Sequence, residues 1–213
     1  MESRMFKVLS KLDRTVALKV IPGHFVTNHS HISHYIDLMT LKSRLNEAKA
    51  AAKILAQYYK SNTIVDTIVC IDGCEVIGAH LAEELTEAGI MSMNAHQTIY
   101  IASPEYHTGG QLIFRDNMQI MVKGKNVLLL LATTSTGKTL QQCLECIEHY
   151  GGRVSGVAAI FSAAEEVNGI PINAIFTEKD IPGYATYSAS KCPMCQEGKK
   201  IDAIVNTYGY SKL

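Results

Sequence analysis

The part of the sequence with the clearest potential for chemistry is the turn at residues 133–139. An apolar run at residues 127–131, typical of a buried strand, leads into this turn of hydroxyl residues, a glycine and a lysine. Residues 139–150 follow with the spacing of a helix. Backbone N–H groups at a helix start bind anions, and glycine lets the backbone approach a phosphate closely. We therefore predict a phosphate site formed by Thr133, Thr134, Ser135, Thr136, Gly137, Lys138 and Thr139.

Two other interpretations of this turn stay open. The first is a Ser/Thr-rich cap that stabilises the helix start and binds no ligand. The second is the phosphate loop of a P-loop nucleotidase, because residues 132–139 fit the relaxed form of that signature. Ala132 replaces the leading glycine of the signature, and the later apolar run at residues 157–161 ends in Ser162 rather than in a magnesium-binding Asp. The nucleotidase pattern is therefore incomplete.

A further set of motifs surrounds the turn. Thr136-Gly137-Lys138-Thr139, the following helix and the strand at residues 153–159 are similar to the 5′-phosphate motif of the type I phosphoribosyltransferase family. Asp72-Gly73 and the residues after it resemble the pyrophosphate loop of that family. Residues 28–37 resemble the segment that covers the base in orotate phosphoribosyltransferases, which are the most similar members. The resemblance extends over most of the chain.

The resemblance implies a glycosyltransferase that moves a phosphoribosyl group from phosphoribosyl pyrophosphate to a nucleobase, in nucleotide synthesis or salvage. A base nitrogen would displace pyrophosphate at C1′ with the help of Mg²⁺. The turn at residues 133–139 would hold the 5′-phosphate, and Asp72 and Gly73 would face pyrophosphate. His107, on a loop at residues 103–117, would close over the site as a catalytic residue. The resemblance also implies a homodimer.

Two positions depart from the family pattern. Leu131 and Ala132 stand where the family has an acidic pair that orients the ribose, engages magnesium and favours positive charge at C1′. The loop keeps His107 but has no lysine at residues 105–110. Losing one preorganised polar group commonly costs about 10²–10³ in rate. The alternative function is therefore a non-catalytic sensor or regulator that binds a nucleotide or a phosphoribosyl compound on the same fold.

Cys192 and Cys195 form a Cys-Pro-Met-Cys motif that resembles half of a zinc knuckle. Two thiolates at this spacing can reach one tetrahedral ion, which makes the pair a candidate zinc site, but such a site takes four ligands. The alternative to a zinc site is that the two cysteines are ordinary thiols in a turn. The histidines near residue 30 could line the base pocket instead of binding zinc. The candidates for the remaining ligands are Cys70, Cys74, His24, His29, His31 and His34.

The elements expected to position these residues alternate along the chain. Helices are predicted at residues 40–60, 76–88 and 139–150, and strands at residues 67–71, 97–102, 127–131, 154–161 and 173–176. Alternating strands and helices indicate an α/β fold with a mainly parallel sheet flanked by helices. We expect one domain, with a small N-terminal hood at residues 1–39, an α/β core at residues 40–190 and a C-terminal tail at residues 191–213 that contains the two cysteines.

Composition narrows the class of protein. The 213 residues include 20 basic and 20 acidic side chains, so a generally basic surface for nucleic acid is not indicated. The apolar run that ends at Ala132 is far too short to span a membrane. The first residues lack the apolar segment of a signal peptide. We therefore expect a cytoplasmic protein with no nucleic-acid or membrane partner.

Overall fold

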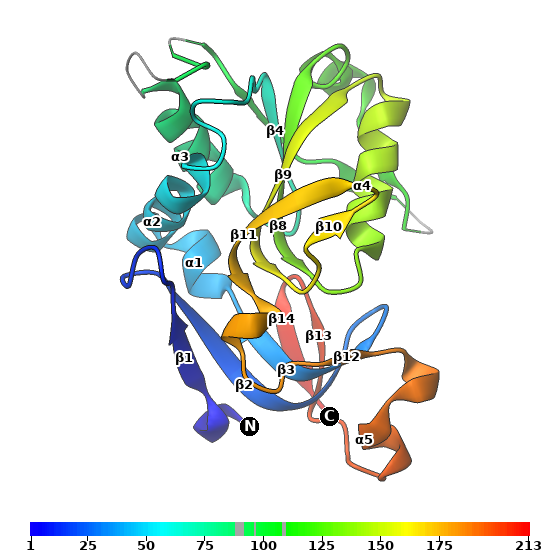
Figure 1. Ribbon diagram of the computed structural model, residues 1–213. Coiled ribbons are helices and arrows are strands. Elements are labelled where there is room, and N and C mark those ends of the chain that lie inside the picture. Colours follow the sequence, from blue (N-terminus) through cyan, green and yellow to red (C-terminus); the bar gives the residue numbers. More distant parts are fainter. Residues whose placement is uncertain (88–91, 96, 108–109) are drawn as a thin grey trace.

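The computed structural model of this chain describes residues 1–87, 92–95, 97–107 and 110–213. Two main sheets lie one above the other in Figure 1. The upper one, the core sheet, has the strand order β10-β11-β9-β8-β4-β5. Its pairings are parallel except that of β10 with β11, which confirms the mainly parallel sheet. The strands are β4 (Thr67–Cys70), β5 (Tyr100–Ala102), β8 (Asn126–Thr134), β9 (Arg153–Ser162), β10 (Glu166–Val167) and β11 (Ile170–Thr177).

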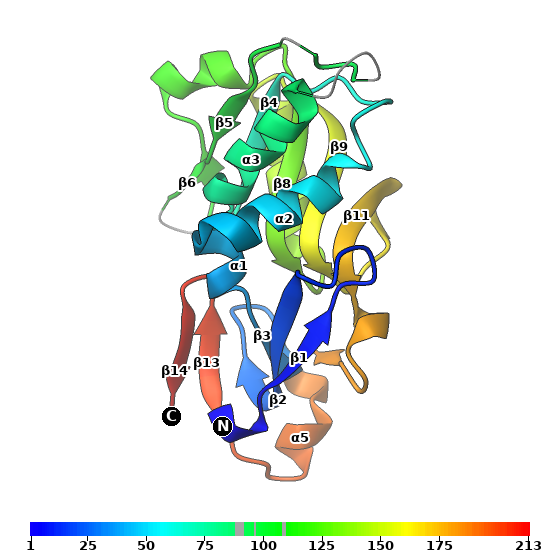
Figure 2. The same cartoon turned by 90° about the vertical axis from the view of Figure 1, so that its left-hand side faces the viewer.

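Helices cover both faces of the core sheet, as predicted. On one face α2 (Leu45–Ala56) and α3 (Glu75–Thr86) pack against side chains such as Ile68 and Leu128. On the other face α4 (Lys138–His149) packs against the alternate side chains, among them Val69 and Leu129. Figure 2 shows α2 and α3 side by side in front of the strands. Because β4 and most of β8 are buried on both faces, their sequences are continuously apolar rather than alternating.

The single helix predicted at residues 40–60 is wrong, because the chain forms two. A short helix, α1 (Met39–Ser43), precedes α2, and Arg44 between them has an extended backbone with φ −100° and ψ 131°. Thr40 lies inside α1. Lys42 of α1 is buried, and its side chain is hydrogen-bonded to residues outside its own helix. The predicted end of α3 at Ala88 lies outside the described residues.

The second sheet forms the hood. It has the order β12-β3-β2-β13-β14, with β1 paired to β2. The expected C-terminal tail contributes β13 and β14 to this sheet, and β13 runs parallel to β2. The hood is therefore built from both ends of the chain. Its elements are η1 (Glu2–Arg4), β1 (Phe6–Leu9), β2 (Ala17–Val26), β3 (His31–Asp37), β12 (Thr186–Tyr187), α5 (Pro193–Gln196), β13 (Ala203–Asn206) and β14 (Gly209–Lys212).

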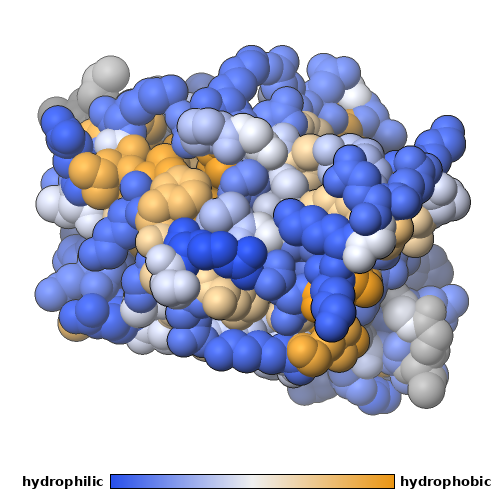
Figure 3. All heavy atoms as spheres, turned by 90° about the horizontal axis from the view of Figure 1, so that it is seen from below, coloured by the Kyte–Doolittle hydropathy of each residue, from blue (hydrophilic) through white to orange (hydrophobic). Residues whose placement is uncertain are grey.

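The remaining elements are short. A hairpin of β6 (Glu105–Tyr106) and β7 (Leu112–Ile113) precedes η3 (Asp116–Met121), and η4 (Glu178–Asp180) and η5 (Ala189–Lys191) lead into the hood. Among the described helices, none has the length and apolar character to span a membrane. The lower face of the molecule is mostly hydrophilic, with separate hydrophobic areas (Figure 3).

Candidate functional site

The turn predicted to bind phosphate connects β8 to α4. Gly137, at the start of α4, has a φ of +74°, and a Cβ atom there would lie 2.9 Å from Cγ2 of Val167. Glycine is thus required both by the left-handed backbone and by the close neighbour. No side chain makes a capping hydrogen bond at the start of α4. The structure therefore shows no hydroxyl cap at this helix start, and the first N–H groups of the helix have no intrahelical partner.

The other residues of the turn differ in exposure. Thr134 is buried, and its carbonyl accepts a hydrogen bond of 2.9 Å from the N–H of Ala163. Thr136 and Lys138 are exposed at the start of α4, and Thr133, Ser135 and Thr139 are half-buried. The turn thus joins a rigid strand end to a helix start whose amides and hydroxyls are available to an anion.

Asp72 and Gly73 follow β4, the strand next to β8. The two strands run parallel with Cys70 opposite Leu130, so Asp72 and Gly73 lie at the same edge of the sheet as the turn. Asp72 has a φ of 63° and Gly73 a φ of 76°, so both have left-handed backbone. Burial raises the pKa of the Asp72 carboxyl to about 6, and Lys42 partly opposes this effect. The structure therefore brings the two predicted binding segments together.

Lys42 is a site residue that sequence reasoning missed. Its side chain is 8% exposed, and its Nζ donates to the carbonyls of Asp72, at 2.6 Å, and Thr207, at 3.0 Å. Thr207 lies in the turn between β13 and β14, so this ammonium group links the hood to the core beside Asp72. A lysine within a helical pattern gives no local signal that it is buried, because its partners lie 30 and 165 residues away.

Leu131 and Ala132, in place of an acidic pair, point into the protein. Leu131 is 0% exposed and Ala132 is 4% exposed, and they belong to the hydrophobic clusters on opposite faces of the core sheet. Neither side chain can bind a metal ion or stabilise positive charge. The end of β8 therefore does not fit Mg²⁺, whose preferred ligands are carboxylate, phosphate and water oxygens.

His107 lies on the hairpin of β6 and β7, where its N–H donates to the carbonyl of Gln111 at 2.8 Å. It is exposed, and its predicted role in closing over the site stays a prediction. Partial desolvation and the charge of Asp72 raise the pKa of the hydroxyl of the neighbouring Tyr106, whose side chain as a whole is exposed. Arg115 forms a bidentate ion pair with Glu105, with both bonds at 2.8 Å, and gives this hairpin a cation that the absence of lysine did not suggest.

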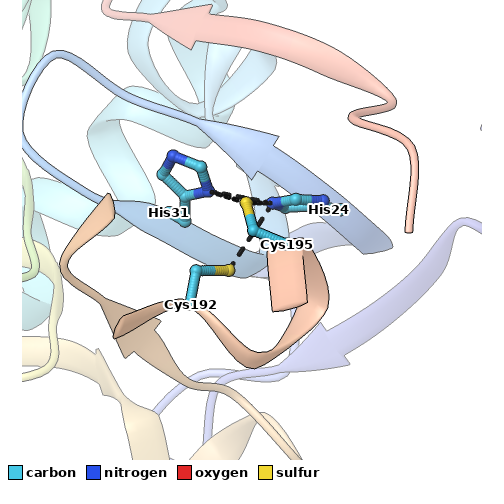
Figure 4. Close-up of side chains that lie close together, drawn as sticks. All are labelled: His24, His31, Cys192 and Cys195. Atoms are coloured by element: carbon cyan, nitrogen blue, oxygen red, sulfur yellow. Dashed lines mark hydrogen bonds between the residues drawn. The ribbon is translucent and has the colours of Figure 1, made fainter. Parts of the chain in front are cut away.

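Cys192 and Cys195 lie in the hood, away from the turn at residues 133–139, and they face two of the histidines near residue 30. The donor atoms of His24, His31 and the two cysteines all lie within 4.8 Å of one another (Figure 4). The other proposed ligands do not join them. Cys70 and Cys74 are buried beside β4 in the core, His34 bonds to Ser33, and His29 is exposed.

Comparison with known proteins gives matches to one family. A family model described as "phosphoribosyl transferase domain" matches residues 39–181. The chain is 24% identical over 182 residues to an orotate phosphoribosyltransferase of Caldicellulosiruptor saccharolyticus, a match that covers 84% of this chain and 86% of the relative.

Solved structures show the same fold. The orotate phosphoribosyltransferase of Aeropyrum pernix superposes with a TM-score of 0.53 at 18% identity, over 75% of this chain and 88% of that one. The orotate phosphoribosyltransferase of Mycobacterium tuberculosis H37Rv, in complex with 5-phospho-α-D-ribosyl 1-diphosphate, gives a TM-score of 0.50 at 14% identity, over 69% of this chain and 82% of that one.

Proposed function

Because the chain belongs to the phosphoribosyltransferase family, whose members are glycosyltransferases, we propose that residues 133–139 hold the 5′-phosphate of phosphoribosyl pyrophosphate. The observation that carries this proposal is the helix start at Gly137, which has no side-chain cap and a backbone that requires glycine. The partial positive charge of a helix N-terminus and its unpaired N–H groups favour a phosphate dianion. Lys138 adds a positive charge beside it.

The pyrophosphate group would then face Asp72 and Gly73. In the reaction, a nitrogen of the base loses its proton to water and forms a bond to C1′ while the bond from C1′ to the pyrophosphate oxygen breaks, and the electron pair of that bond leaves with pyrophosphate. The left-handed backbone at Asp72 and Gly73, together with the missing side chain of Gly73, would let the loop approach the leaving group closely. Lys42 fixes this loop from behind through the carbonyl of Asp72. His107 and the hairpin that carries it would cover the site.

Magnesium supports the departure of pyrophosphate in this chemistry by neutralising its charge. The side chains of Leu131 and Ala132 at the end of β8 offer it no ligand. Asp72 is the carboxylate at this edge of the sheet that could join the pyrophosphate oxygens in holding such an ion. We expect the ionised carboxylate of Asp72 to be the form that holds the ion.

We propose a pyrimidine base of the orotate type as the acceptor. The support is the similarity to the orotate phosphoribosyltransferase of C. saccharolyticus, together with the hood segment at residues 28–37. A homodimer and a cytoplasmic location stay predictions. Sedimentation of the purified chain and fractionation of cells that express it would test them.

A second function is favoured by the burial of Leu131 and Ala132, which leaves the ribose without the carboxylates that normally orient it. In this alternative the chain binds phosphoribosyl pyrophosphate or a nucleotide at the same turn and transfers nothing. Phosphate binding does not depend on the two missing carboxylates, whereas transfer does. The two functions therefore predict the same ligand and different turnover.

Calorimetry and a turnover assay on the same preparation separate these functions. We expect heat of binding with phosphoribosyl pyrophosphate in either case. Formation of orotidine monophosphate from orotate, followed by ultraviolet absorbance, would establish the transferase, and other pyrimidine and purine bases should be tested in parallel. Binding without product from any base would favour the non-catalytic function. No binding of phosphoribosyl pyrophosphate or of nucleotides would contradict both.

A further inference from the structure

We propose that His24, His31, Cys192 and Cys195 form a structural zinc site in the hood. The donor atoms are Nε2 of His24, Nδ1 of His31 and the two Sγ atoms, all within 4.8 Å of one another. Figure 4 shows the four side chains converging from β2, the start of β3 and the segment around α5. Two thiolates and two imidazoles are a common ligand set of structural zinc.

Three of the distances between donor atoms fit a tetrahedral ion. Zinc bonds of about 2.3 Å to sulfur and 2.0–2.1 Å to nitrogen place neighbouring ligands about 3.3–3.8 Å apart. Nε2 of His24 lies 3.6 Å from the Sγ of Cys192 and 3.6 Å from the Sγ of Cys195. Nδ1 of His31 lies 3.3 Å from the Sγ of Cys195. The two nitrogens are 2.9 Å apart, so zinc would separate them by about half an ångström.

The tautomer of His24 also suits a metal ligand. Its Nδ1 lies 2.9 Å from the carbonyl oxygen of Lys199, and a carbonyl can only accept a hydrogen bond. Nδ1 therefore carries the proton, and in the neutral ring Nε2 presents its lone pair to the two sulfurs. A hydrogen bond of this kind behind a ligating histidine fixes both the tautomer and the direction of the ring.

The location indicates a structural rather than a catalytic ion. Both histidines and Cys192 are buried, and four protein ligands leave no position open for substrate. The site joins the β2–β3 hairpin, near the N-terminus, to α5, near the C-terminus. Beside it, Asp202 accepts a hydrogen bond of 2.9 Å from the N–H of His24 and another of 2.6 Å from Arg4. Zinc would thus lock together the two ends of the chain that build the hood.

Metal analysis of the whole chain tests this proposal without reference to phosphoribosyl pyrophosphate, so its outcome is independent of the proposed function. After expression in zinc-supplemented medium and dialysis, we expect about one zinc ion per chain. Cobalt substituted for zinc should give the visible d–d bands of a tetrahedral ion and a thiolate-to-cobalt charge-transfer band in the near ultraviolet. Removal of zinc with a chelator should lower the melting temperature, and zinc should restore it.

Matched variants locate the ion. Cys195→Ser and His31→Ala should lose the zinc. His29→Ala, an exposed histidine of the same hairpin, and Cys146→Ser, a buried cysteine of α4, should keep it. If the ligand variants do not fold, the cobalt spectrum of the unaltered chain still shows whether a tetrahedral site with thiolate ligands is present. A chain without zinc, a Cys192–Cys195 disulfide in its place, or zinc retained in full by both ligand variants would overturn the proposal.

Discussion

Three residues at the carboxyl edge of the core sheet have left-handed backbone: Asp72, Gly73 and Gly137. Such conformations are costly for most residues and gather at sites where the backbone itself meets a ligand. Glycine takes two of the three positions, and aspartate tolerates this conformation better than most other residues. The proposed phosphate and pyrophosphate positions therefore depend on backbone shape more than on charged side chains.

Gly137→Ala tests the phosphate turn. The new methyl group would meet Val167 at 2.9 Å and would strain a φ of +74°, so the turn must shift and misalign its N–H groups. Loss of one hydrogen bond to a charged group costs about 1.5–3 kcal/mol, which corresponds to roughly a 10- to 100-fold weaker affinity for phosphoribosyl pyrophosphate. Titration calorimetry measures the change.

Gly124→Ala is the matched control for this variant. Gly124 has a φ of +72° with no atom within 4 Å of an added Cβ, and it precedes β8 at the opposite edge of the sheet. Gly124→Ala should strain the backbone about as much as Gly137→Ala does, but it should leave the affinity for phosphoribosyl pyrophosphate unchanged. Equal affinities in the two variants would show that the turn does not contact the ligand.

Asp72 should make the stability of the protein depend on pH. Its pKa rises from 3.8 to about 6 on folding because the carboxyl is buried, so the folded state favours the protonated form. The free energy of unfolding should therefore fall as pH rises from about 4 to about 6. Asp72→Asn removes this pH dependence. Relative to the unaltered chain, the free energy of unfolding of the variant should therefore rise by about 2–3 kcal/mol between pH 4 and pH 7.

Urea unfolding of both proteins across this pH range provides the measurement. Asp116→Asn, an exposed position at the start of η3, serves as control and should not change the pH profile. A constant difference in stability between Asp72→Asn and the unaltered chain at all pH values would contradict the burial of an ionisable carboxyl at this edge.

At the scale of elements, local pattern predicted the core sheet well. Solidly apolar runs correctly predicted β4, β8 and β9, because burial on both faces leaves a clear local signal. The break at Arg44 could not be predicted, since residues on both sides of it have good helix propensity. The break becomes understandable from the contacts of Lys42, which reach distant parts of the chain.

Lys42→Met tests the link between α1 and the hood. The substitution keeps the apolar length of the side chain and leaves two carbonyls, of Asp72 and Thr207, without their donor. We expect the free energy of unfolding to fall by about 1–3 kcal/mol. Lys49→Met, on the exposed face of α2, should change it little. A loss in Lys49→Met as large as that in Lys42→Met would contradict a specific role for this contact.

At the scale of the whole molecule, the hood is assembled by pairings that no local pattern reveals. β13 lies beside β2, with Ala203 opposite Phe25, so strands from the two ends of the chain share one sheet. For the same reason the Cys-Pro-Met-Cys motif indicated half of the proposed metal site, whereas the two histidines of that site could not be chosen from four candidates. Figure 1 shows the hood below the core sheet, and the hydrogen bonds from Lys42 to the carbonyls of Thr207 and Asp72 link the two parts.

A crystal structure of the chain with phosphoribosyl pyrophosphate would test the central claim most directly. We expect the 5′-phosphate within hydrogen-bond distance of the backbone N–H groups at residues 135–139, and the pyrophosphate next to Asp72 and Gly73. Electron density for the ligand at another place, with the turn before α4 exposed to water or closed by side chains, would contradict the account.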